Sequence, residues 1–404
     1  MRICMLLAGQ DFPPDARVER EARALASAGH EILVLASNYT DSPPRDLWQD
    51  NISVVRLPTS PRILFGLSRR IRFELFIDIQ WLVFLYGLVR RERVDILHVH
   101  DLPMALTAWL VGKLKNIPVV LDLHENWPVL VSMSAALKHS RPRRLTNLQR
   151  WQKYEKWAIS NVDKVIVVIE EARDRLTELG CPAEKITVVS NTIDVDRFCS
   201  YPIDKTISQQ YAEEFAVSYI GTFGLHRGLD IAIKAMPLLL EKVPNARLLL
   251  VGVDEKTQKL AQQLQNLTKE ISVSDRVIFL EHQEFNKIPS WIKASDVGLI
   301  PHNTNPHTNA TVPNKLFQYM CLGKPVVVSD CPPLKRVVES SRSGLVFESG
   351  NSVALSAVLS KLEDEALRKE LGANGREAVR QIYNWQKDAL KLLRLYQELE
   401  KAEF

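Results

Sequence analysis

Apolar runs and amphipathic segments alternate along the chain, and this alternation predicts its secondary structure. In the first half, runs rich in Val, Ile and Leu predict strands at 3–8, 31–37, 53–57, 96–100, 119–124, 164–169 and 186–190. Segments with apolar residues at helical spacing lie between them, for example at 15–28 and 145–160. Strands that alternate with helices in this way indicate a parallel, doubly wound sheet of the α/β class.

The alternation pauses once and then resumes. Residues 194–214 are polar and show no clear period, which is typical of a linker. A second series of strands is predicted at 216–220, 247–251, 277–280, 297–301, 325–329 and 344–347, followed by a helical tail. Because one core rarely fills a chain of 404 residues, we predict two Rossmann-like domains, 1–195 and 215–383, that face each other across a cleft. The C-terminal helix, 384–404, could pack back on the first domain.

The stretch from Pro313 to Asp330 is the most informative part of the chain. It is predicted to be a short helix with a proline in its first turn, a stop at Gly323 and then a buried strand. The start of such a helix presents free N–H groups and the positive end of a dipole, which favours a bound phosphate. Lys315, in the first turn, is expected to add a mobile cation. The alternative is an ordinary helix–strand unit with a lysine in solvent.

A glycine-rich turn at 221–230 follows the first strand of the second domain and opens a helix. Gly221 and Gly228 allow the backbone to approach a bound group closely, and Arg227 can clamp phosphate oxygens. The Gly-x-Gly-x-x-Gly spacing of a dinucleotide site is absent. We expect Arg227 and Lys315 to converge on a diphosphate, although a plain strand–turn–helix junction would have a similar sequence.

Two predicted strands of the first domain end with a histidine beside a carboxylate. His100 precedes Asp101, and His124 precedes Glu125. Such pairs can bind a metal ion, shuttle protons or hydrogen-bond a sugar hydroxyl. His98 lies deeper in its strand, so we expect it to be a core residue.

The first long helix begins with charged residues. Asp15 is expected to cap the helix, and Arg17 and Glu21 have the spacing of a pair on its surface. Because this loop should line the cleft, a role in acceptor binding stays open. Asp194-Val195-Asp196 matches an Asp-x-Asp signature of metal-dependent sugar transferases with another fold, but its place in the linker favours a capped turn.

The net charge and the cysteine pattern bear on the protein's binding partners and on its cellular compartment. The formal net charge of +4 is too small to indicate nucleic-acid binding. Scattered cysteines without a Cys-x-x-Cys pair, and a beginning that lacks the pattern of a signal peptide, predict a cytoplasmic protein. The most apolar stretch, 75–89, is too short and too polar to span a bilayer. Two basic segments, 61–93 and 138–153, fit an anionic membrane surface as well as solvated helix faces.

Taken in order, these motifs resemble those of the family 4 glycosyltransferases, or glycosyl transferases group 1, which have the GT-B fold and retain anomeric configuration. The resemblance covers nearly the whole chain. It rests on the segments 12–17, 98–101, 121–125, 191–198, 221–228, 294–301 and 313–330.

The resemblance implies roles for individual residues. The implied catalytic residues are Arg227, Lys315 and His124. The implied donor-binding residues are Gly221, Thr222, Arg227, Asn314, Lys315, Leu316, Phe317, Gln318 and His282, with backbone N–H groups at 315–317. The implied acceptor-binding residues are Asp15, Arg17, His100, Asp101 and Glu125. No metal and no cofactor are expected, because cationic side chains and helix ends would take the place of a metal ion.

The chain departs from the family pattern at two places. The family's two glutamates, spaced Glu-x7-Glu, fall on Ala310 and Gln318, and an arginine found early in the phosphate loop is replaced by Thr222. A glutamine can still hydrogen-bond a ribose, so we expect donor binding to survive. Other candidates for contacts with the transferred sugar are Asn309, Thr311 and the segment 302–308.

By this resemblance, the protein is expected to be a retaining, metal-independent hexosyltransferase or a related enzyme. It would move a sugar from a nucleotide-diphosphate donor, a UDP- or GDP-sugar, to a glycan or lipid-linked acceptor in cell-envelope or exopolysaccharide synthesis. It would be cytoplasmic, with peripheral attachment to an anionic membrane surface left open. Two alternatives stay open: a nucleotide-sugar epimerase of the same build, and a non-catalytic sugar-nucleotide-binding protein.

Overall fold

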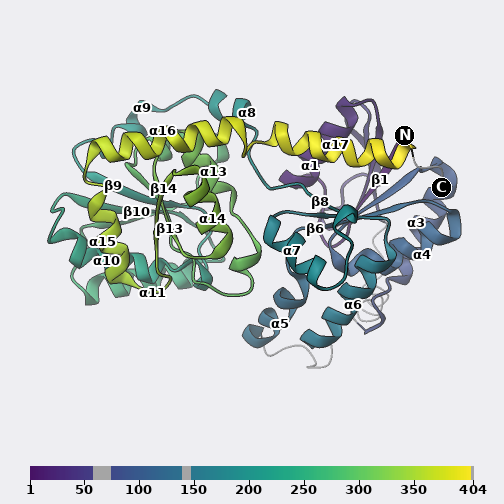
Figure 1. The fold of residues 1–404 in the computed structure, drawn as a ribbon, viewed down its shortest axis with the longest axis horizontal. Helices are drawn as coiled ribbons and strands as arrows, with labels where there is room; N and C mark the ends of the chain where they lie inside the picture. The colour runs from purple at the N-terminus through teal and green to yellow at the C-terminus, as the bar shows by residue number, and fades with distance from the viewer. Residues whose placement is uncertain (58–73, 139–146, 402–404) are drawn as a thin grey trace. The chain divides into compact units, whose positions relative to one another are not determined.

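The computed structural model describes residues 1–57, 74–138 and 147–401, and these divide into two compact units. The first unit is Met1–Ser190 together with Asp388–Phe404, and the second is Asn191–Lys387. Each unit has one sheet with helices on both of its faces (Figure 1). The predicted architecture of two doubly wound α/β domains is therefore confirmed.

The described residues of the first unit form an eight-stranded sheet in the order β3-β4-β2-β1-β5-β6-β7-β8. The strands are β1 (Arg2–Leu7), β2 (Glu31–Ala36), β3 (Arg45–Gln49), β4 (Ile52–Arg56), β5 (Ile96–His100), β6 (Val119–Leu123), β7 (Lys164–Val167) and β8 (Ile186–Val188). All neighbours pair in parallel except β3, which runs antiparallel to β4. Between β1 and β5 the direction in which successive strands are added to the sheet reverses. In sheets of this kind ligands bind beside this point, at the carboxyl ends of the strands.

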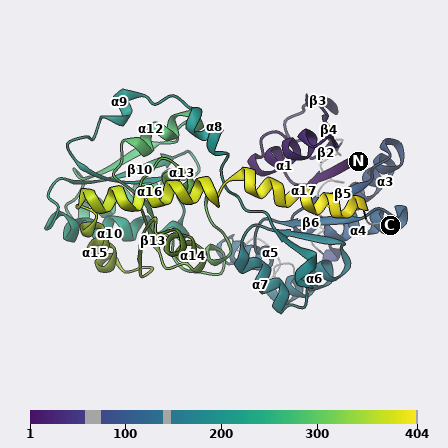
Figure 2. The same cartoon turned by 45° about the horizontal axis from the view of Figure 1, so that its top comes forward.

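Helices cover both faces of this sheet. They are α1 (Ala16–Ser27), α3 (Ile79–Glu92), α4 (Ala105–Lys115), α5 (Trp127–Lys138), α6 (Leu148–Asn161) and α7 (Glu170–Glu178). The last helix of the chain, α17 (Trp385–Lys401), contributes its residues from Asp388 onward to this unit. It lies beside α1 (Figure 2) and buries Leu392, Leu395 and Tyr396.

The second unit has a parallel sheet in the order β11-β10-β9-β12-β13-β14. Its strands are β9 (Phe215–Ile220), β10 (Ala246–Val253), β11 (Val277–Glu281), β12 (Val297–Ile300), β13 (Val326–Ser329) and β14 (Gly344–Phe347). Its helices are α8 (Val195–Ser200), α9 (Lys205–Ser208), α10 (Leu229–Leu240), α11 (Gln258–Glu270), α12 (Ile288–Lys293), α13 (Asn314–Cys321), α14 (Pro332–Ser341), α15 (Ser352–Lys361) and α16 (Glu365–Gln381). The order reverses between β9 and β12, so the loops that follow these two strands flank the expected ligand position.

Two features differ from the sequence prediction. The strand β3 was not predicted, because its side chains alternate between exposed and half-buried positions and its only partner is the antiparallel β4. The segment 194–214 was predicted to be a polar linker without a clear period, and it contains the short helices α8 and α9. Both features are short and polar, and apolar periodicity is a weak signal for such elements.

Membrane crossing is not indicated by the helices. Among those that the structure describes, none combines the length and the apolar character needed to span a bilayer.

Candidate functional site

The loop after β9 requires glycine at two positions. Gly221 has φ +137°, and a Cβ there would lie 2.6 Å from the Lys315 ammonium. Gly228 has φ +64°, and a Cβ there would lie 1.9 Å from the carbonyl oxygen of Pro301, at the end of β12. At Gly228 both the backbone conformation and the lack of space exclude larger residues, whereas at Gly221 the backbone conformation is the main constraint, because the nearest atom belongs to the flexible end of Lys315. Gly228 thus allows this loop to lie against the end of β12, at the reversal point of the sheet.

The helix α13 begins beside this loop. Pro313 is its N-cap, so the proline lies just before the first turn of the helix, whereas the sequence predicted it within that turn. The Leu316 N–H donates to the Pro313 carbonyl over 3.1 Å. This N–H, which the resemblance implied would bind the donor diphosphate, therefore already has an acceptor within the protein. The helix ends at Cys321, and Gly323, which follows its C-cap, has φ +69°, as a helix stop requires. The strand β13 that follows is fully buried, as predicted. The side chains of Leu316, Phe317 and Gln318 are buried, which leaves Lys315 as the side chain of this turn nearest to the glycine loop.

Lys315 is not the mobile cation that the sequence predicted. Its ammonium lies 3.5 Å from the centroid of the Tyr219 ring, and the Tyr219 hydroxyl donates to the Thr222 carbonyl over 2.8 Å. Burial, followed by the charge of Arg227, holds the pKa of Lys315 well below its usual range. The ammonium is therefore fixed in a place where water solvates it poorly.

Arg227 is surrounded by neutral imidazoles. Its Nη1 donates to His302 Nε2 over 3.0 Å. Burial and the charge of Arg227 hold the pKa of His302 well below its usual range, and they lower the pKa of His226 to about 4. Neither Arg227 nor Lys315 forms an ion pair with any residue that the structure describes. This corner of the second unit thus holds two cations without an anion of its own.

The other implied donor residues vary in exposure. Thr222 and His282 are exposed, and Gln318 is buried within α13. The side-chain oxygens of Asn309 and Asn314 are buried and have no hydrogen-bond partner among the described residues. A buried polar atom without a partner is costly, so a bound polar group would relieve both sites.

A second cluster of charged groups lies in the first unit, centred on Asp122. This residue is the last but one of β6, near the carboxyl end of the strand, and it is fully buried. Arg17, from α1, donates to both of its carboxylate oxygens, over 2.9 Å each, and its Nη2 also lies 2.9 Å from Glu21. His124 Nε2 lies 3.0 Å from Asp122 Oδ2. The Arg17 guanidinium and His124 hold the pKa of Asp122 well below its usual range, although burial alone would raise it.

The histidines of this cluster carry different charges. Burial alone would lower the pKa of His124, but Asp122 and Asp101 raise it to about 9, so His124 is an imidazolium at neutral pH. His100 Nδ1 lies 3.1 Å from His124 Nε2, and burial together with His98 lowers the pKa of His100. The cluster therefore presents one positive, half-buried imidazolium, which can donate a hydrogen bond to an oxygen ligand.

A metal ion would find suitable ligands here, but the site already holds a cation. Ligand atoms of Glu21, His98, His100 and Asp122 lie within 4.8 Å of one another. The Arg17 guanidinium binds both carboxylates of this group and supplies the positive charge that a metal ion would bring. The Tyr396 hydroxyl, from α17, lies 2.7 Å from His98 Nδ1 and closes the cluster on the side of the C-terminal helix.

The structure places the predicted acceptor residues in two groups. Asp15 caps α1 by accepting from the N–H groups of Arg17 and Val18. Arg17 and His100 are buried and bonded within the cluster, so we assign them to the positioning of Asp122 and His124 rather than to direct contact with an acceptor. Asp101 and Glu125 are half-buried beside His124.

Three further interpretations of the sequence can be compared with the structure. The predicted pair of Arg17 and Glu21 forms, at 2.9 Å, but both side chains are buried and do not lie on the helix surface. His98 is a core residue, as expected. Asp194 accepts from the Arg197 N–H and caps α8, as expected for a turn.

Sequence reasoning missed two members of the Asp122 cluster. Asp122 lies within the segment 121–125 on which the family resemblance rests, but a carboxylate inside an apolar, fully buried strand indicates a functional or structural site by itself. Tyr396 carried no such signal, because its place beside His98 depends on a contact between residues that are 298 positions apart.

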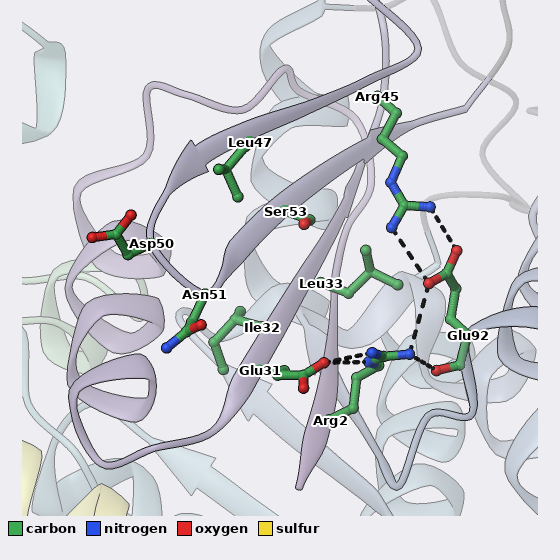
Figure 3. Close-up of a pocket in the computed structure, with 10 residues that line it drawn as sticks. All are labelled: Arg2, Glu31, Ile32, Leu33, Arg45, Leu47, Asp50, Asn51, Ser53 and Glu92. Atoms are coloured by element: carbon green, nitrogen blue, oxygen red, sulfur yellow. Dashed lines mark hydrogen bonds and ion pairs between the residues drawn. The ribbon is translucent and has the colours of Figure 1, made fainter.

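A cavity of about 480 Å³ lies at the opposite, amino end of the first sheet. Its charged residues pair with one another: Arg2 with Glu31 over 2.8 Å, and Arg45 with Glu92 over 2.6 Å (Figure 3). Because these charges are compensated, the cavity lacks the unpaired cations that distinguish the corner around Arg227.

The chain is similar to glycosyltransferases over most of its length. A family model described as Glycosyltransferase Family 4 matches residues 16–197, and one described as glycosyl transferases group 1 matches residues 201–378. A D-inositol 3-phosphate glycosyltransferase from Xylanimonas cellulosilytica is 26% identical over 94% of this chain and 90% of its own length.

Solved structures share the fold. A sucrose-phosphate synthase from Thermosynechococcus elongatus superposes with a TM-score of 0.79 and 20% identity, covering 100% of both chains. HepE from Anabaena, in complex with UDP, gives a TM-score of 0.70 and 15% identity over 98% of this chain and 100% of its own. At these identities the structural likeness concerns the fold, whereas the family models cover the sequence of both units.

Proposed function

Because the chain belongs to the family of glycosyl transferases group 1, we propose that it transfers a sugar from a nucleotide-diphosphate donor to a glycan or lipid-linked acceptor, with retention of anomeric configuration. The observation that carries this proposal is the corner formed by Arg227, Lys315 and the start of α13. Two cations lie there without an anionic partner among the described residues. A diphosphate is the group whose charge and size fit them.

Arg227 and Lys315 would also stabilise the diphosphate as it leaves the sugar. As the bond to the sugar breaks, negative charge grows on the diphosphate, and fixed cations stabilise that charge without having to reorganise. Arg227 stays charged at every relevant pH, whereas the depressed pKa of Lys315 would rise when an anion binds beside it. We propose that these groups act in place of a metal ion.

We assign the retaining step to front-face attack. In that mechanism an oxygen of the departing phosphate accepts the proton of the acceptor hydroxyl, which then bonds to the sugar on the face that the phosphate leaves. His124, as an imidazolium, would hydrogen-bond an oxygen of the transferred sugar, and Asp122 and Arg17 would hold it in orientation. The structure of HepE with UDP makes a uridine nucleotide the first donor to examine.

Calorimetric titration with UDP-, GDP-, ADP- and dTDP-sugars, followed by assay of the released nucleotide diphosphate, tests the proposal. We expect selective binding, slow hydrolysis of one donor, and faster release when an acceptor is added. Arg227→Ala should weaken binding and turnover, whereas Lys335→Ala, which removes an exposed cation of α14, should leave both unchanged. Undiminished turnover in Arg227→Ala would contradict the role of the phosphate clamp.

The two alternatives predict other results in the same samples. An epimerase would convert the donor sugar without any acceptor. A non-catalytic sensor would bind a donor and never release the nucleotide diphosphate. Absence of binding to every donor would mean that the changes at Thr222, Ala310 and Gln318 have removed the site.

We also propose that α3 attaches the protein to an anionic membrane surface. Ile79, Val83 and Tyr86 are exposed along one side of this helix, and Arg90 and Arg91 form its exposed last turn. Apolar side chains beside basic ones match a bilayer with acidic head groups. Of the other predicted basic residues, those at 61–73 and 139–146 lie outside the described residues, whereas Arg93 caps the end of α3 and Arg150 and Lys153 lie in α6.

Flotation with vesicles of phosphatidylcholine and phosphatidylglycerol tests this attachment. Val83 is 68% exposed on α3, and Val353 is 63% exposed on α15, which makes Val353 a matched control. We expect Val83→Glu to reduce flotation and Val353→Glu to leave it unchanged. Equal flotation of both variants and the wild type would contradict the assignment of α3.

A further inference from the structure

Two cysteines from distant parts of the sequence meet in the second unit. Cys199 lies in α8 and Cys321 is the last residue of α13, and their sulfur atoms are 2.9 Å apart. Both are free thiols. A disulfide has a sulfur–sulfur distance of about 2.0 Å, so the two atoms need to approach by only about 0.9 Å to bond. The other three cysteines are buried singly elsewhere.

The two thiols differ in their access to solvent. Cys199 is exposed, whereas Cys321 is buried. A cavity of about 470 Å³ lies against both, and its charged lining consists of one carboxylate, Asp196, and three cations, Arg376, Arg380 and Lys387. Burial raises the pKa of the Cys321 thiol, and the charges of Arg376 and Arg380 oppose that rise. Cations beside a thiol also attract anionic reagents. An incoming reagent would therefore reach Cys199 first, and Cys321 would lie behind it.

We propose that Cys199 and Cys321 form a reversible thiol–disulfide modification site, whose oxidant is a low-molecular-weight disulfide that carries carboxylates. The Cys199 thiolate attacks one sulfur of the reagent, the reagent's own sulfur–sulfur bond breaks, and one thiol leaves. Cys321 then loses its proton and attacks the Cys199 sulfur, which releases the second thiol. Two protein thiols thus give up two electrons and two protons, and one reagent disulfide becomes two thiols.

A disulfide between Cys199 and Cys321 would join α8, near the point where the chain enters the second unit, to the end of α13. The helix α8 follows Asn191, where the chain enters the second unit. The entering segment pairs with the leaving one through an isolated bridge between Ile193 and Asn384, and the Trp385 N–H donates to the Ile193 carbonyl over 2.9 Å. A Cys199–Cys321 bond would fix this region to α13, whose other end carries Lys315. The inference does not depend on which reaction the protein catalyses.

The decisive experiment treats the reduced full-length protein with excess glutathione disulfide, alkylates the remaining thiols and maps the peptides without reduction. We expect two thiols to be lost per chain, a peptide pair that links Cys199 to Cys321, and full reversal by dithiothreitol. Cys181→Ser should behave as the wild type, whereas Cys321→Ser should stop at a glutathione adduct on Cys199. A wild-type protein that keeps both thiols, or that stops at the adduct, would overturn the proposal.

The rates of reaction with a charged and a neutral disulfide reagent test whether the arginines beside the thiols attract an anionic oxidant. Arg380→Gln should slow the reaction with glutathione disulfide several-fold and leave the reaction with the neutral 2-hydroxyethyl disulfide unchanged. Arg394→Gln, which removes an exposed arginine of α17, should change neither rate. If Arg380→Gln slowed both reagents equally, the preference for an anionic oxidant would be refuted.

Discussion

Replacing Lys315 by methionine should stabilise the ligand-free protein and weaken its binding of nucleotide diphosphates. The ammonium has no anionic partner among the described residues, and burial holds its pKa well below the usual range. Its contact with the Tyr219 ring, at 3.5 Å, offsets part of this cost by about 0.5–2 kcal/mol. Methionine keeps most of the packing volume and removes the charge.

The two effects have different sizes. Because the side chain is only half-buried, solvent screens part of the charge, and we expect the free energy of unfolding at pH 7 to rise by about 1 kcal/mol. A hydrogen bond between two charged groups contributes about 1.5–3 kcal/mol, so the dissociation constant for UDP should increase by about 10- to 150-fold.

The pH dependence gives a separate test of the lysine. Since the pKa of Lys315 is lower in the folded state, the unfolded chain binds more protons between that value and the unfolded pKa near 10.4. The stability of the wild type should therefore rise with pH across this window, and this contribution should vanish in Lys315→Met. Binding of UDP should take up protons in the wild type where Lys315 is neutral.

Urea unfolding at several pH values and calorimetric titration with UDP measure both effects. Lys324→Met is the matched control, because burial also lowers the pKa of this lysine, to about 8, while its ammonium donates to the Lys293 carbonyl away from the glycine loop. It should leave the affinity for UDP unchanged. A Lys315→Met protein that is less stable than the wild type and binds UDP equally well would refute the reasoning.

Three further predictions concern single residues. Asp122→Asn should lower the free energy of unfolding by about 3–5 kcal/mol, because it leaves a buried guanidinium with one carboxylate fewer, and NMR titration should show the pKa of His124 falling from about 9; an unchanged His124 would contradict this. Gly228→Ala should cost more stability in urea than Gly350→Ala, since both have positive φ but only Gly228 meets backbone, at 1.9 Å, where a Cβ would lie; equal costs would refute the steric argument. Tyr396→Phe should lower stability by about 1–2 kcal/mol through loss of its buried hydrogen bond, measured by thermal or urea unfolding, and no loss would show that this bond is not formed in solution.

Much of the fold was determined by the sequence alone. Apolar runs located every described strand except β3, and their alternation with helices indicated parallel sheets in two units. Gly221, Gly228 and Gly323 marked positions with positive φ, and Pro313 marked the start of α13. These features are local: the conformational freedom of one residue, or the period of a few, is enough to express them.

The candidate site depended on the tertiary structure. The sequence could name Lys315 and Arg227, but only the fold fixed the ammonium over the Tyr219 ring and left both cations without a partner among the described residues. The fold also placed Tyr396 against His98 and Cys199 against Cys321. Such contacts join residues between 96 and 298 positions apart, so no local pattern encodes them. Charge, pKa and reactivity depend on burial and on these neighbours, and both exist only once the chain has folded.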